Sequence, residues 1–140
     1  MNAEQSDVAR QCAELSAAGQ IDFGEVVRRL MAAGIERYHA DYSRGETTYY
    51  AADGGSCVVT MNLEPMNLKH GAIAAEFSAA GVEAAVRQAQ RGEIKYAQFS
   101  RQAVAAGCVG YFVQISGKRV QYFGRNGEIH TEWFPGVKPS

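Results

Sequence analysis

Histidines are the only side chains in this sequence whose ordinary pKa lies near neutral pH, and His39 has the most suggestive neighbours. Residues 35–42 alternate between apolar and polar types, which predicts a strand with Arg37, His39 and Asp41 on its polar face. A cation, an imidazole and a carboxylate in one row could bind an anion or relay a proton. The simpler interpretation is a solvated strand face, because alternation by itself places polar residues outside the core.

A second candidate set lies in the last predicted strand, where His130 and Glu132 share a face. We expect this face to be polar and exposed like that of His39, so that the two sets could converge if the halves of the chain pack together. Convergence is not required, because the two sets are not related by the shift of 73 residues that relates the two halves of the chain. His70, beside Lys69, is expected to lie in a solvated loop.

The three cysteines are interpreted as structural thiols in a reducing compartment, because Cys12, Cys57 and Cys108 are far apart and odd in number. Cys57 could be a nucleophile only with a partner such as His130, which holds the corresponding position in the second half. The sequence contains no CxxC, CxxH or HxxxH pair, no P-loop, and no G-x-S-x-G or G-x-G-x-x-G motif. We therefore predict no metal and no cofactor, and favour a protein that is not an enzyme.

Length and charge disfavour several classes of protein. A chain of 140 residues with 14 basic and 15 acidic side chains can form one packed domain and has a formal net charge of −1. This balance disfavours nucleic acid and anionic membranes as partners. Nothing in the sequence resembles a secretion signal or a membrane span, so we expect a cytoplasmic protein. Acidic neighbours dilute the arginines that a nucleic-acid surface would use, which are Arg28, Arg29, Arg87, Arg91 and Arg101.

The chain repeats itself with an offset of 73 residues and without a gap. The run Ala32-Ala33-Gly34, for example, matches Ala105-Ala106-Gly107. Further identical pairs are Gly19 with Gly92, Ile21 with Ile94, Tyr38 with Tyr111, Tyr49 with Tyr122 and Gly54 with Gly127. An ungapped register of this length indicates a single domain, residues 1–140, made of two pseudo-repeats at about 3–67 and 76–140.

Each repeat is predicted to contain two helices followed by three strands. The predicted helices end near residues 19 and 34 in the first repeat and cover about 74–91 and 95–106 in the second; the predicted strands are 35–42, 47–51, 56–61, 108–115, 119–123 and 128–134. The core-facing stripe of the second helix consists of Phe23, Val26, Val27, Leu30 and Met31. The predicted class is α+β, with helices on one face of either a single six-stranded antiparallel sheet or two facing three-stranded sheets.

Several of these motifs resemble the YbcV-like family of bacterial and prophage proteins. The resemblance covers roughly residues 20–135 and rests on the run QRGEIKYAQF at 90–99, the cap Ala106-Gly107, and the ending Tyr122-Phe123 with Gly127 and Glu128. It implies a small α+β domain of unknown function, in a family of which some members are labelled phage envelope proteins. It implies no catalytic or binding residue, and the loop 62–71 lies outside its pattern.

Adjacent aromatic residues in the predicted strands suggest an interaction surface. The neighbours in Tyr49-Tyr50 and Tyr122-Phe123 point to opposite faces, so we expect Tyr50 and Phe123 outside the helix-covered core. Exposed aromatic residues on a bare sheet face mark subunit or ligand interfaces. We favour a binding module, of phage origin as the resemblance implies, that dimerises or binds a partner through this face or the loop 62–71. The alternative, a small-molecule-binding protein or small enzyme, would use Arg37, His39, Asp41, His130 or Glu132.

Overall fold

The computed structural model describes residues 1–62 and 72–137, and in them helices and strands follow the predicted order. The first half contains α1 (Ala3–Ala17), α2 (Phe23–Ala32), β1 (Ile35–Asp41), β2 (Glu46–Ala51) and β3 (Ser56–Thr60). The second half contains α4 (Ala79–Gln90), α5 (Tyr96–Ala105), β4 (Gly110–Gln114), β5 (Arg119–Phe123) and β6 (Ile129–Trp133). None of these helices has the length and apolar character needed to cross a membrane.

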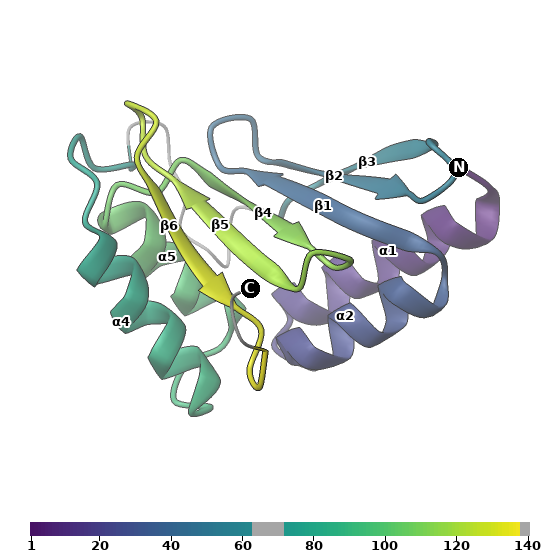
Figure 1. Ribbon diagram of the computed structural model, residues 1–140, viewed down its shortest axis with the longest axis horizontal. Helices are drawn as coiled ribbons and strands as arrows, with labels where there is room; N and C mark the ends of the chain where they lie inside the picture. The colour runs from purple at the N-terminus through teal and green to yellow at the C-terminus, as the bar shows by residue number, and fades with distance from the viewer. Residues whose placement is uncertain (63–71, 138–140) are drawn as a thin grey trace.

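All six strands belong to one antiparallel sheet with the order β3-β2-β1-β4-β5-β6. The two halves join where β1 pairs with β4, with Arg37 opposite Gln114 and Asp41 opposite Gly110. The structure therefore selects the single sheet over the two facing sheets that the sequence also allowed. The four helices of the described residues lie along one face of this sheet, and none of them lies on its other face (Figure 1). The α+β class is confirmed.

The positions of the elements support an internal duplication. Helices α2 and α5 begin and end 73 residues apart, and so do strands β3 and β6. Helices α2 and α5 each end shortly before a glycine in the left-handed conformation. These glycines are Gly34, with φ +83°, and Gly107, with φ +84°. Such a φ is favourable only for glycine, which explains why both repeats keep this residue. The helix–strand pattern thus suggests two similar halves.

Two details of the helices differ from the predictions. Helix α4 begins at Ala79 and not near residue 74, because the Ser78 side chain accepts a hydrogen bond from the Gly81 N–H and fixes the helix start there. In α2, Phe23 and Met31 are 41% and 59% exposed, although both belong to the predicted core stripe. Five apolar positions span too wide an arc for a helix that contacts the sheet along one line.

The core between helices and sheet is rich in tyrosine. Tyr38 and Tyr49 of the first half, and their counterparts Tyr111 and Tyr122, are all buried. Burial raises the pKa of each of these hydroxyls, because the charged phenolate would lose its water. Hydrogen bonds satisfy the deeper hydroxyls: the Tyr42 hydroxyl contacts Ser100 Oγ at 3.1 Å, and the Tyr96 and Tyr111 hydroxyls are 2.6 Å apart.

This core predicts alkaline instability. The folded-state pKa of the buried tyrosines lies above the unfolded value of about 10, so the folded chain holds protons that the unfolded chain releases. The free energy of unfolding is therefore expected to be unaffected by these tyrosines below about pH 10 and to fall as pH rises beyond it. Urea unfolding between pH 8 and 11 measures this, with Tyr38→Phe expected to reduce the slope. Ionisation of the full tyrosine set, seen by absorbance, in a chain that stays folded would contradict the prediction.

The equivalent glycines Gly34 and Gly107 provide a matched stability test. Gly34→Ala should cost about 1–2 kcal/mol, because alanine is strained in the left-handed region and its Cβ would meet only the flexible Gln5 side chain at 3.3 Å. Gly107→Ala should cost clearly more, since its Cβ would lie 2.1 Å from the Glu76 backbone oxygen. Denaturant unfolding of both variants checks the order, and equal losses would refute it.

Candidate functional site

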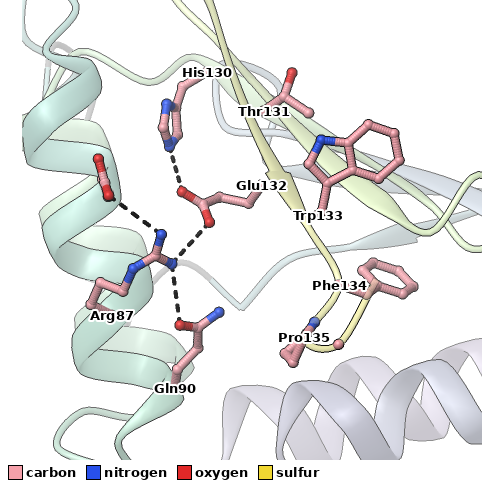
Figure 2. Close-up of a pocket in the computed structure, with 10 residues that line it drawn as sticks. Arg87, Gln90, His130, Thr131, Glu132, Trp133, Phe134 and Pro135 are labelled. Carbon is pink, nitrogen blue, oxygen red and sulfur yellow. Dashed lines mark hydrogen bonds and ion pairs between the residues drawn. The ribbon is translucent and has the colours of Figure 1, made fainter. Parts of the chain in front are cut away.

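The residues most able to do chemistry gather in a groove between α4 and the edge strand β6 (Figure 2). The groove has a volume of about 540 Å³ and is lined by Glu83, Arg87 and Gln90 from α4 and by residues 130–136 from β6 and the turn that follows. Figure 2 shows Arg87 reaching from α4 toward Glu132, with His130 on the other side of that carboxylate. We call Arg87, His130 and Glu132 the groove triad.

The register of the sheet determines where His130 and Glu132 lie. His130 is opposite Tyr122 and Glu132 is opposite Val120, and both partners belong to the buried core. The two side chains therefore occupy the helix-covered face, and Glu132 is only 9% exposed. The prediction that they share one face is correct, but the prediction that this face is the exposed polar one is wrong. In β6 the ionisable residues His130 and Glu132 lie on the helix-covered face, and the apolar residues lie on the other face. Helix α4 makes this possible because its Arg87 contacts the Glu132 carboxylate.

The groove triad is held by short charge-assisted contacts. The His130 Nε2 and Glu132 Oε2 atoms are 2.6 Å apart, and Arg87 Nη1 donates to Glu132 Oε1 at 2.9 Å. Arg87 also donates to Gln90 at 3.2 Å and to Glu83 at 3.3 Å. The hydrogen bond that Arg87 donates to Glu132, followed by the charges of Glu132 and Glu83, raises the pKa of the Arg87 guanidinium. Arg87 consequently stays charged and neutralises the buried carboxylate.

Chemically, the triad resembles the orienting half of an acid–base site. A carboxylate that binds one imidazole nitrogen fixes the ring and leaves the other nitrogen to exchange a proton with a bound molecule. Among the described residues, the side-chain hydrogen bond of His130 goes to Glu132 and not to a hydroxyl or thiol. The described residues also include no group of three or more His, Cys, Asp or Glu side chains placed to hold a metal ion.

The other predicted set lies on the opposite, helix-free face of the sheet. Arg37, His39 and Asp41 are partly exposed there, as the alternation predicts. Their side chains have separate partners: the Arg37 guanidinium lies 4.4 Å from the centre of the Tyr50 ring, and the His39 ring stacks on Phe112 with 5.0 Å between centroids. Because His39 and His130 face opposite sides of the sheet, the two polar sets do not converge.

The pairing of Cys57 with His130 is also wrong. Cys57 lies in β3 and His130 in β6, and these strands form the two opposite edges of the sheet. The duplication relates their positions by symmetry but separates them in space. The other thiols are buried, and burial raises the pKa of Cys108 to about 11, which keeps it protonated and unreactive.

Arg87 is the residue of the triad that sequence reasoning placed elsewhere, on a solvated helix face. Its spacing of four residues from Glu83 was visible in the sequence, but its contact with Glu132 spans 45 residues and depends on how α4 lies under β6. Most of the other arginines considered for nucleic acid are paired with nearby acids: Arg28 and Arg29 contact Glu25, and Arg91 contacts Glu93. These pairs leave little unbalanced positive charge on the helices.

The burial of Glu132 predicts a measurable coupling with Arg87. Glu132→Gln should lower the free energy of unfolding by about 1–2 kcal/mol, because it removes the charge from two buried hydrogen bonds. A double-mutant cycle with Arg87→Met should give a coupling of about 1 kcal/mol. The control is the exposed pair of Glu25 and Arg28, with an expected coupling of about 0.5 kcal/mol or less. Equal couplings in the two cycles would show that Glu132 behaves as a surface residue.

Comparison with known proteins identifies the family of the chain. No curated protein shows significant similarity to the chain. A family model described as "Protein of unknown function (DUF1398)" matches residues 59–132, a segment that includes all three residues of the groove triad. The finer resemblance to YbcV-like proteins stays a prediction. Because the match spans more than half of the chain, the protein belongs to the DUF1398 family of proteins of unknown function.

Proposed function

We propose that the chain is a non-enzymatic binding module and that a partner protein docks on the helix-free face of its sheet. We call this surface the open face. It carries apolar and aromatic side chains from five of its strands, namely Tyr50, Val58, Phe112, Phe123, Ile129 and Trp133. The observation that carries the proposal is this row of large apolar groups on a face without helices (Figure 1).

Exposure supports an interaction role for the open face. Val58 and Ile129, near its two ends, are 57% and 55% exposed. Single exposed apolar residues need no explanation, but a series that crosses a whole sheet face is typical of a binding surface. The predicted position of Tyr50 and Phe123 outside the core agrees with their partial exposure. Tyrosine, tryptophan and arginine are also the residues that most often dominate the binding energy of interfaces.

Charge indicates what kind of surface fits. Arg37, which also pairs with Glu36, stacks on Tyr50, and the Arg119 guanidinium lies 4.8 Å from the centre of the Trp133 ring. The acids on this face are already engaged: Asp41 accepts hydrogen bonds from the backbone of the next turn, and Glu46 pairs with Arg44. Two open faces pressed together would bring like charges close. We therefore propose a different protein, with an apolar centre and carboxylates beside it, over a second copy.

A second function, small-molecule binding or acid–base chemistry in the groove, is favoured by one observation. The 2.6 Å contact between His130 and Glu132 lies in a groove of about 540 Å³, which has room for a small ligand. We rank it below the binding module because Arg87, Glu132 and His130 already satisfy one another. A cytoplasmic location and a phage origin stay proposals, the first supported by the free state of all three cysteines.

The docking proposal predicts that Tyr50→Ser combined with Phe123→Ser weakens partner binding by about 30-fold or more, as loss of central aromatic anchors usually does. The measurement is affinity capture from the host lysate with the wild-type chain, identification of the retained protein, and titration of that purified protein. Met31→Ser is the matched control, since Met31 is exposed on α2 and lies outside the open face. Equal affinity of the double variant and the wild type would refute docking on this face.

A further inference from the structure

The free edge of β6 carries an unused set of backbone hydrogen-bonding groups. Gly124 donates to the Glu128 carbonyl and Phe134 donates to the Lys118 carbonyl, so these are hydrogen-bonded pairs of the β5–β6 ladder. In an antiparallel ladder such pairs alternate with non-bonded ones. The N–H and C=O groups of Ile129, Thr131 and Trp133 therefore point away from β5, and no hydrogen bond joins them to another described segment.

We infer that this edge pairs with the same edge of a second copy, in an antiparallel register centred on Thr131. The two sheets then continue as one across a twofold axis. The outward N–H and C=O groups of Thr131 pair with those of Thr131 in the second copy. The outward groups of Ile129 pair with those of Trp133 in the second copy. Every outward backbone N–H and C=O group of the strand thereby gains a hydrogen-bonding partner within the protein. At a free edge these groups are unpaired.

The side chains of β6 are self-complementary in this register. On the helix side, His130 stands opposite Glu132 of the second copy, which places an imidazole next to a carboxylate twice. On the open face, Ile129 stands opposite Trp133, an aliphatic–aromatic pair of the kind that stabilises neighbouring strands. A symmetric interface requires that a surface complement itself, and the palindromic order apolar, ionisable, Thr, ionisable, apolar does so.

The same residues disfavour other occupants of the edge. A strand with apolar side chains on the helix side would cover the second imidazole nitrogen of His130 and the exposed part of Arg87 with groups that cannot hydrogen-bond to them, at a free-energy cost. Inward-pointing charges are a known means by which edge strands avoid unspecific pairing. A second copy avoids the cost because it supplies the matching groups.

A groove borders β6 on the helix side. The groove beside β6 is lined by Arg87, Glu83 and Gln90, and it borders His130 and Glu132 along the strand (Figure 2). The His130 and Glu132 side chains of the second copy would enter this groove from across the axis. There Arg87 is placed to contact either carboxylate, since 42% of its side chain is exposed.

The test replaces Thr131 by proline. Its N–H points away from β5, so the proline removes a donor of the proposed dimer and none of the internal ladder. Sedimentation equilibrium or native mass spectrometry should show the wild type at twice 15.2 kDa and Thr131→Pro with at least tenfold weaker association. Thr131→Val keeps the N–H and should dimerise. A wild type that stays monomeric at high micromolar concentration overturns the proposal.

A proline on the other edge provides the matched control. Val58 holds the position in β3 that corresponds to Thr131 in β6, and its N–H also points away from the neighbouring strand. Val58→Pro should leave the dimer intact; loss of the dimer in this variant alone would assign the interface to β3 and overturn the proposal. The open-face variant with Tyr50→Ser and Phe123→Ser should also dimerise, so that failure of the partner proposal is distinguishable from failure of this one.

Amide hydrogen exchange of the wild type gives a readout without any substitution. The amides of Ile129, Thr131 and Trp133 should exchange several-fold more slowly as protein concentration rises through the dimerisation range. The amides of His130 and Glu132 already point toward β5 and should change far less. Concentration-independent exchange of the three outward amides would refute the proposed pairing even if Thr131→Pro failed to fold.

Discussion

The antiparallel pairing of β1 with β4 is the contact on which the rest of the structure depends. Each half alone would be a three-stranded sheet with two helices, too small to bury its apolar surface well. Joining the halves through their first strands makes these strands central, where Tyr38 and Val113 lie opposite each other in the core. It also places the equivalent strands β3 and β6 at the two edges of the sheet that the described residues form.

The same pairing explains how the chain separates a core from the open face. Antiparallel strands alternate between two faces, and all helices approach from one side (Figure 1). Tyrosines at Tyr49 and Tyr122 consequently enter the core, while their neighbours Tyr50 and Phe123 are turned outward. The arginines stacked on Tyr50 and Trp133 cover part of the aromatic surface of the open face with charged groups.

Local signals in the sequence predicted much of this fold. The glycines at Gly34 and Gly107 identified helix ends because their backbone conformation excludes other residues, and the offset of 73 residues carried each assignment from one half to the other. The choice of one sheet over two was not predictable, since it depends on which strand edges meet. The burial of Glu132 was not predictable either. The alternation of residue types identifies β6 as a strand but does not show which of its faces the helices cover. That face is determined by α4 and by Arg87, which is 45 residues from Glu132 along the chain.

A buried carboxylate on an edge strand needs a physical reason, because an apolar residue of similar size would give comparable or greater stability. The hydrogen bonds from Arg87 and His130 offset the desolvation of Glu132 but do not by themselves explain its presence. An edge strand has a second requirement, which is to reject unrelated strands. Polar groups held on the helix side of β6 meet that requirement, because an apolar strand would leave the second nitrogen of His130 and the exposed part of Arg87 without a hydrogen-bonding partner. In the edge pairing that we infer, a copy of the same strand supplies a carboxylate and an imidazole at these positions. The groove triad is thus better explained by the specificity of the edge than by the stability of the single chain.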